Sequence, residues 1–162
     1  MNKELPKNIE AEKCLIGSMF WSNESLQKGC EEVEKEIFYL DSHAKIFEAI
    51  KSLYLNNTPV DITSLTTYLI SIDKINEVGG VEYLNEIVNS VATGANIEYY
   101  INLVSDKYTL RKMIEVATDI VNKATNQDNS AADTIDDAEK EILNISKFRR
   151  TSEFRKVQDV LT

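Results

Sequence analysis

The sequence predicts an all-α protein in which a compact bundle of short helices is followed by a long helical hairpin. Three observations support this fold class. Only 5 Gly and 2 Pro occur among 162 residues, which leaves little turn material for an all-β fold. Long uninterrupted stretches are filled with Leu, Ile, Glu, Lys and Ala, most of which favour helices. The 43% hydrophobic and 28% charged content is that of an ordinary soluble globular protein.

The first two helices are short. Helical spacing of apolar residues predicts the first over residues 9–20, behind the cap candidate Asn8 and with two glutamates in its first turn. Gly17 lies inside this helix, where glycine costs stability relative to alanine, so we expect a neighbouring backbone to approach it closely. A second short helix is predicted over residues 26–33.

Two further helices have clear start and stop signals. Asp41 and Ser42 are cap candidates for a helix that continues with apolar residues at helical spacing until Asn-Asn-Thr-Pro at residues 56–59 ends it. Asp61 is the next cap candidate, before a helix with one apolar face over residues 62–72. This part of the chain is therefore predicted to be a run of short helices packed together.

Gly79 and Gly80 predict a sharp corner. A helix that ends here needs a residue that tolerates positive φ, and a second glycine lets the chain turn into the next helix. That helix has an apolar stripe over residues 81–91 and is expected to stop at Thr93-Gly94. None of the five glycines starts a G-x-x-x-x-G-K-S/T pattern, so the sequence predicts no phosphate-binding loop.

Two long helices form the carboxyl-terminal third. Residues 97–124 contain no Gly or Pro and are predicted to form one helix, and Ser130 resembles the cap of another helix that continues to about Lys147. The short loop between them makes the two helices antiparallel neighbours. The expected organisation is a globular helical subdomain over residues 1–95, a helical hairpin over residues 96–147 and the start of a linker over residues 148–162.

The first long helix has more apolar surface than one partner helix can cover. At 100° per residue its apolar side chains spread over about 160°, wider than the stripe of a helix that meets a single neighbour. One interpretation is that another chain or a different protein covers the remaining strip. The alternative is that the hairpin folds back on residues 1–95, and the pattern does not separate the two. The side chains concerned are Leu110, Met113, Ile114, Val116, Ala117, Ile120, Val121 and Ala124.

Charge and hydropathy exclude several functions. The net charge is -9 at pH 7, and because residues 147–162 hold five basic and two acidic residues, the rest of the chain is more acidic still. Such a surface repels phosphate backbones, so we expect little or no direct nucleic-acid binding. No apolar run is long enough to span a membrane and the amino terminus has no apolar signal core, which predicts a cytoplasmic protein without a membrane partner.

The titratable residues indicate no catalytic or metal site. His43 is the only histidine, which excludes sites that need two imidazoles, and its place in a first helical turn indicates a hydrogen-bonded structural group. Cys14 and Cys30 lie in helical pattern without metal-ligand spacing, and we interpret them as reduced buried thiols. The acidic clusters are expected to form solvated helix faces.

Six pieces of sequence, in one order, resemble a known family. They are EAEKCLIGSM, FY with a histidine shortly after it and then IFEAI, PVDI before a leucine-rich helix, VGGVEYLNEIV, NIEYYINLV and LRKMIE. Together they are similar to the amino-terminal domain of the DnaB family of bacterial replicative DNA helicases, over about Leu5 to Ser146. The chain departs from the family pattern at Ile37, where aspartate is usual, and at Ile101, where a small residue is usual.

The resemblance implies a part of a helicase without its motor. In the family an ATP-hydrolysing domain follows and uses ATP and Mg²⁺, so neither a catalytic residue nor a cofactor is expected in this chain. The implied function is non-catalytic: oligomerisation as the collar of a hexameric replicative DNA helicase, and docking of primase. The basic segment after Ser146 is expected to dock on a neighbouring subunit, in preference to being a disordered end or a nucleic-acid contact.

The resemblance also implies partners and contacts. The chain is expected to form dimers or hexamers through its hairpin and to bind the carboxyl-terminal helicase-binding domain of primase, with a helicase loader as a further candidate partner. Primase contacts fall on Tyr83, Ile114 and Ile120, and Ile114 is expected to be the least external because it lies towards the middle of the apolar arc. The residues expected in self-association are Leu110, Met113, Val116, Ala117 and Val121.

Two other functions stay open on sequence grounds. The first is a free-standing helical adaptor or loader-like protein, for which Thr162 would be the natural carboxyl terminus. The second is a small helical enzyme whose site the sequence does not reveal. The mass in solution separates these from a collar, because a strictly monomeric chain at high concentration would argue against self-association.

Overall fold

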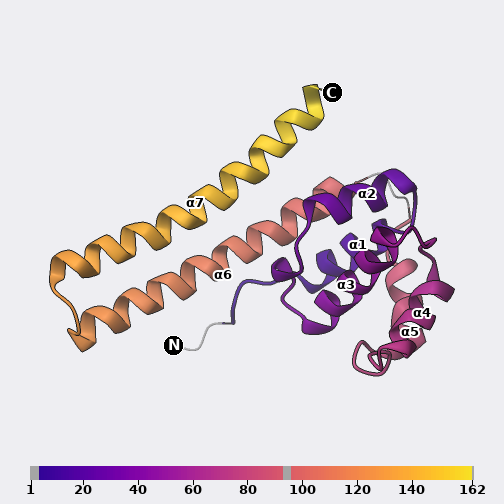
Figure 1. Ribbon diagram of the computed structural model, residues 1–162, viewed down its shortest axis with the longest axis horizontal. Helices are drawn as coiled ribbons and strands as arrows, with labels where there is room; N and C mark the ends of the chain where they lie inside the picture. Colours follow the sequence, from indigo (N-terminus) through magenta and orange to yellow (C-terminus); the bar gives the residue numbers. More distant parts are fainter. Residues whose placement is uncertain (1–3, 93–95, 162) are drawn as a thin grey trace. The chain divides into compact units, whose positions relative to one another are not determined.

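The computed structural model describes residues 4–92 and 96–161, which form helices joined by loops (Figure 1). No strand occurs within these two ranges, and the all-α class is confirmed. A short 3-10 helix, η1 (Lys35–Ile37), lies between the second and third helices. The α-helices in chain order are α1 (Ile9–Ser18), α2 (Asn23–Glu32), α3 (Asp41–Leu55), α4 (Ile62–Ser71), α5 (Gly80–Val88), α6 (Ile97–Asn126) and α7 (Ala131–Leu161).

The chain divides into two compact units. One is Lys7–Tyr108, and the other is Thr109–Thr162 with Met1–Pro6. The sequence placed the boundary just before α6, but Ile97, Ile101 and Val104 at the start of this helix are buried in the core of the first unit. The beginning of α6 therefore belongs to the globular unit, because its apolar side chains complete that core.

The core of the globular unit forms where α1, α3, α4 and α5 pack together. Gly17 in α1 faces α5 so closely that a Cβ atom there would lie 2.4 Å from the carbonyl oxygen of Ile87 and 2.7 Å from Oγ of Ser90. The close backbone approach predicted at Gly17 is thus confirmed. The largest fully buried apolar side chains of this core are Leu15, Ile16, Met19, Ile46, Phe47, Ile50, Leu65, Leu69, Leu84 and Ile87.

Two expected helix caps are confirmed. The Asn8 side chain accepts a hydrogen bond from the backbone N–H of Ala11 at 3.0 Å. Asp61 accepts from the N–H of Ser64 at 2.7 Å, and the Ser64 hydroxyl accepts from the N–H of Asp61 at 3.0 Å, which makes a reciprocal capping box. These bonds satisfy amides that the start of a helix leaves without an intrahelical partner.

The expected cap of α3 is wrong. This helix begins at Asp41, behind Leu40, which makes no side-chain cap bond. A carboxylate from α1 meets the amides here instead, because Glu12 accepts from the N–H of Tyr39 at 2.7 Å and from that of Leu40 at 3.4 Å. Sequence spacing reveals caps that are local, whereas Glu12 lies 27 residues before Tyr39 in the chain.

The corner predicted at the two glycines is confirmed. Gly79 and Gly80 have φ values of 103° and 75°, which side chains other than glycine rarely adopt. The helix that follows, α5, ends at Val88, before the stop expected at Thr93-Gly94. Residues 93–95 lie outside the described residues.

The hairpin consists of the two longest helices (Figure 1). At the start of α7 the Ser130 hydroxyl accepts from the N–H of Asp133 at 3.1 Å, as its role as a cap predicts. The expected end of α7 at about Lys147 is wrong, because no Gly or Pro interrupts the sequence before Leu161 and the helix continues to that residue. The basic segment expected to dock on a neighbour begins at Lys147, and its side chains from residue 148 onward lie outside the described residues. No helix in the described part of the chain is long and apolar enough to cross a bilayer.

Candidate functional site

The hairpin leaves a broad apolar surface that its own two helices do not cover. Val121 is 61% exposed and Met113 is 53% exposed, which are large fractions for apolar side chains. Single exposed apolar side chains are common, but several of them gathered on one helix pair indicate an interaction surface. The exposed large apolar residues of the hairpin are Leu110, Met113, Ile114 and Val121 on α6 and Ile135, Ile142 and Leu143 on α7.

Two grooves lie between α6 and α7. The groove nearer the connecting loop has a volume of about 520 Å³ and is lined by Ala124 and Ile135, among others. The second has a volume of about 320 Å³ and is lined by Met113 and Ile142, among others. Ile120 lines both grooves. The hairpin surface is therefore hollowed as well as apolar, and it can receive side chains from a partner.

The candidate contact residues on α6 differ in exposure from what the sequence predicts. Ile114 is 42% exposed, whereas Ile120 is half-buried between the two helices. The expected order of exposure is therefore reversed, because α7 packs along the flank of α6 that carries Ile120. Among the self-association candidates Leu110, Met113, Ala117 and Val121 are exposed, and Val116 is half-buried.

An ion-pair cluster links the two hairpin helices. Lys123 on α6 lies 3.0 Å from Asp119 on the same helix and 3.5 Å from Glu141 on α7. The hydrogen bond with Asp119 raises the pKa of Lys123, so the ammonium stays charged. Because the group is exposed to solvent, we assign it a role in aligning the helices and little stabilising energy.

A buried polar network occupies the globular unit. Glu12 of α1 and His43 of α3 are both almost completely inaccessible, at 1% and 0% exposure. Oε1 of Glu12 lies 2.8 Å from Nδ1 of His43, and Nε2 of His43 lies 2.5 Å from the hydroxyl of Tyr83 on α5. His43 is thus the hydrogen-bonded structural group that the sequence predicts.

Tyr83, the third candidate contact residue, packs on His43. Its ring stacks on the imidazole of His43 with a centroid distance of 5.8 Å and an angle of 4° between the planes. The position of Tyr83 also requires glycine at residue 79, where an added Cβ atom would lie 2.8 Å from Cβ of Tyr83. The side chain is half-buried, and burial raises the pKa of its phenol. Tyr83 belongs to the globular unit, whereas Ile114 and Ile120 belong to the hairpin unit.

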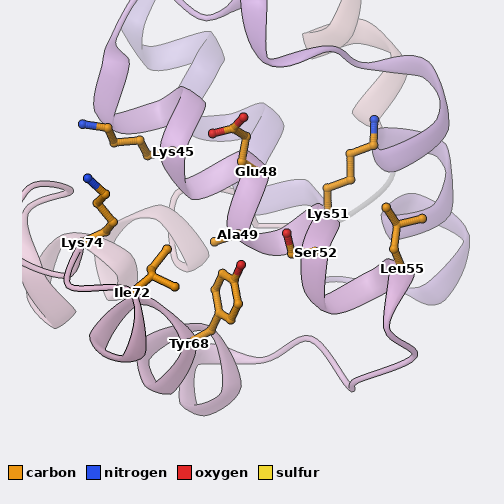
Figure 2. A pocket seen from close by; sticks show the side chains of 9 residues that line it. All are labelled: Lys45, Glu48, Ala49, Lys51, Ser52, Leu55, Tyr68, Ile72 and Lys74. Atoms are coloured by element: carbon orange, nitrogen blue, oxygen red, sulfur yellow. The ribbon is translucent and has the colours of Figure 1, made fainter.

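A further groove, which the sequence did not single out, lies between α3 and α4 (Figure 2). Its volume is about 440 Å³, and Leu55 and Ile72 contribute exposed apolar surface to it. Figure 2 shows Lys45 and Lys74 together at one end, where both ammonium groups approach the carboxylate of Glu77, at 2.7 Å and 3.4 Å. The helical spacing of residues 45, 48, 52 and 55 on α3 is a signal that could have identified this face.

The two thiols of the chain both lie in the globular unit. Cys30 is buried, and burial raises the pKa of its thiol to about 11, which opposes formation of the nucleophilic thiolate. Cys14 is half-buried, and its Sγ lies 3.8 Å from the carbonyl oxygen of Ser90. Within the described residues no three His, Cys, Asp or Glu side chains gather as metal ligands would.

Comparison with known proteins places these features in context. Residues 4–106 match the family described as "DnaB-like helicase N terminal domain". The chain is 38% identical over 156 residues to the replicative DNA helicase DnaC of Bacillus subtilis and 33% identical over 156 residues to the replicative DNA helicase DnaB of Geobacillus stearothermophilus. Each alignment covers 96% of this chain and 34% of the relative, so the chain spans about a third of their length.

A solved structure gives the same assignment for the fold. The crystal structure of the N-terminal domain of DnaB helicase from Mycobacterium tuberculosis superimposes with a TM-score of 0.80 at 27% sequence identity. The match covers 88% of this chain and 99% of that one, and therefore includes most of both helical units.

Proposed function

Because the chain belongs to the family of DnaB-like helicase N-terminal domains, we propose that it is a non-catalytic assembly and docking module of a replicative DNA helicase. The observation that carries this proposal is the apolar surface of the hairpin, with its exposed residues on both helices. Contact with another protein removes such a surface from water, and the gain is on the order of 25 cal/mol per Å² of apolar area.

Self-association is the first part of the proposal. Leu110, Met113, Ala117 and Val121 recur every three or four residues, so they form one continuous stripe along α6. Two copies of such a stripe can pack against each other in a symmetric dimer, in which each hairpin buries the same surface. Dimers that join further give the hexameric collar that we propose for the whole helicase.

Docking of primase is the second part. Ile114 is exposed on α6 and Tyr83 is half-buried on α5, so both have surface to offer a partner. Ile120 offers less, because its side chain is half-buried between α6 and α7. We assign these three contacts to the carboxyl-terminal domain of primase and keep a helicase loader as a further candidate partner.

The whole protein's chemistry is proposed to lie outside this chain. ATP-dependent unwinding of DNA requires a domain that holds phosphates and Mg²⁺, and the glycines of this chain do not form the corresponding loop. The net charge of -9 also opposes direct binding of nucleic acid. We therefore propose that the chain acts through protein–protein contacts in DNA replication and that it is cytoplasmic.

Sedimentation equilibrium of the chain, alone and with the primase domain, tests the proposal. We expect dimers or larger assemblies, and a Val121→Glu variant should weaken self-association roughly tenfold or more, because one buried aliphatic side chain stabilises by about 1.5–3 kcal/mol. Leu55→Glu, at an exposed leucine of the globular unit, is the matched control and should leave the assembly unchanged. A monomer at high concentration that also fails to bind the primase domain would refute the proposal.

A further inference from the structure

The polar network in the globular unit is a series of hydrogen bonds whose donors and acceptors follow one order. It begins at Glu12, passes through His43 and ends at Tyr83, with 2.8 Å and 2.5 Å between the bonded atoms. Its first two members are fully enclosed and its last member reaches the surface. The position of each proton in this network therefore decides whether the Tyr83 hydroxyl donates a hydrogen bond to a partner or accepts one.

Glu12, at the buried end of the network, determines which atom donates in each hydrogen bond. Its Oε2 accepts from the backbone N–H of Tyr39 at 2.7 Å, and its Oε1 is the atom that faces His43. A carboxylate only accepts hydrogen bonds, so Nδ1 of the imidazole has to carry the proton in this contact. In a neutral imidazole Nε2 is then the acceptor, and the hydroxyl of Tyr83 has to donate to it.

We propose that Glu12 and His43 orient the Tyr83 hydroxyl so that its proton points inward and only its oxygen lone pairs face a docking partner. The partner group that meets this oxygen is consequently a hydrogen-bond donor, such as a lysine, arginine or amide side chain. Glu12 and His43 are positioning residues in this scheme and do not touch the partner. The inference rests on the docking role proposed above for Tyr83.

The surroundings keep the arrangement in place. Stacking on the imidazole restricts the rotation of the Tyr83 ring. Burial raises the pKa of the phenol, so the hydroxyl keeps the proton that it donates to His43. An outside group that could only accept would have to break the inner bond, and His43 would then lose its partner in a buried position.

The tautomer of His43 can be read directly, because it is the only histidine of the chain. Nitrogen-15 NMR of the wild-type chain at neutral pH should show a proton on Nδ1 and none on Nε2. In Glu12→Gln we expect the carbonyl oxygen at the N–H of Tyr39, because that contact of 2.7 Å is much shorter than the 3.4 Å contact with the N–H of Leu40. The amide nitrogen then faces His43 and should move the proton of the imidazole to Nε2. A wild-type ring that carries its proton on Nε2, or on both nitrogens, overturns the proposal.

Binding to the carboxyl-terminal domain of the cognate primase tests the partner side. Tyr83→Phe removes the outward oxygen and should weaken binding roughly three- to tenfold, the usual effect of one hydrogen bond. Glu12→Gln should weaken it by a similar factor in the wild-type background and have no further effect in Tyr83→Phe. Tyr99→Phe, at an exposed tyrosine of the same unit, is the matched control and should bind as the wild type does.

The outcomes separate this inference from the proposed function. If the wild-type chain does not bind the primase domain, the docking function fails whatever the tautomer of His43. If it binds and Tyr83→Phe binds equally well, docking stands and the inference is overturned. Tyr83→Phe and the wild-type spectrum decide the question even if Glu12→Gln does not fold, and additive losses in the double variant would also contradict the scheme.

Discussion

Replacing Gly17 by alanine should push two helices of the globular unit apart. The added Cβ would lie 2.4 Å from the carbonyl oxygen of Ile87 and 2.7 Å from Oγ of Ser90. The serine hydroxyl can turn away, but the carbonyl belongs to the backbone of α5 and moves only with that helix. An ordinary contact begins near 3.4 Å, so α1 and α5 would have to separate by about 1 Å at this point.

The expected change in the free energy of unfolding follows from two opposing effects. Overpacking of a core costs typically 1–3 kcal/mol, and alanine inside a helix regains about 0.5–1 kcal/mol relative to glycine. The difference is about 0–2.5 kcal/mol, and because the atom in the way belongs to the backbone we expect the free energy of unfolding of Gly17→Ala to fall by about 1–2 kcal/mol, the upper part of that range. Because α5 carries Tyr83, the same displacement should also change the environment of that residue.

Urea unfolding followed by circular dichroism measures the effect. Gly29→Ala is the control, because the three atoms nearest to a Cβ atom there all belong to the side chain of Met19, which can change rotamer, and none belongs to the backbone. We expect a smaller loss of stability in Gly29→Ala than in Gly17→Ala. The two unfolding midpoints can be compared directly if the slope of the free energy of unfolding against urea concentration is the same in both variants. If Gly17→Ala were as stable as the wild type, the close packing of α1 on α5 would be refuted.

Three further predictions follow from the other sites. Ile114→Asp should weaken binding of the primase domain in calorimetry by more than Ile120→Asp does, because Ile114 is the exposed residue, and the opposite order would contradict the placement of α7. Cys30, with its pKa raised to about 11, should react with iodoacetamide at about pH 8 only after unfolding, which peptide mass mapping detects. Hydrogen bonds from Lys45 and Lys74 lower the pKa of Glu77 below its usual 4.5, so this carboxylate stabilises the fold above that pH and the contribution is lost as pH falls through the lowered value. Glu77→Gln should therefore flatten the acid side of the stability profile in thermal melts, and an unchanged profile would contradict the pairing.

Local signals in the sequence are sufficient for most of the fold. The starts of α1 and α4 depend on Asn8 and Asp61, which act within three residues of themselves. The corner at Gly79 depends on backbone conformation alone. The end of α7 is mispredicted because the apolar residues at helical spacing, which begin at Ile135, become less regular beyond Ile145. The residues beyond still favour a helix, and no Gly or Pro stops it before Leu161.

The arrangement of the candidate site depends on contacts that spacing does not reveal. Periodicity identifies the apolar residues of α6, but it does not say which flank of the arc α7 covers. The prediction that Ile114 lies towards the middle of the arc is wrong, because at 100° per residue Ile114 and Ile120 lie about 120° apart, near opposite edges of the arc. The edge that carries Ile120 is the one that faces α7, and Ile114 stays exposed. The network from Glu12 to Tyr83 joins residues 31 and 40 positions apart, so neither bond follows from a local pattern.

The two units should respond to mutation in different ways, because their surfaces depend on different physics. The hairpin offers apolar area, and burial of such area is non-directional, so exchanges among Leu, Ile and Met at Met113 or Val121 should change self-association only slightly. The network around His43 depends on which atom carries each proton, so even Glu12→Gln, which keeps the size of the side chain, should change what Tyr83 presents. If the hairpin tolerates these exchanges and Glu12→Gln weakens primase binding, then buried apolar area determines assembly and the direction of hydrogen bonds determines docking.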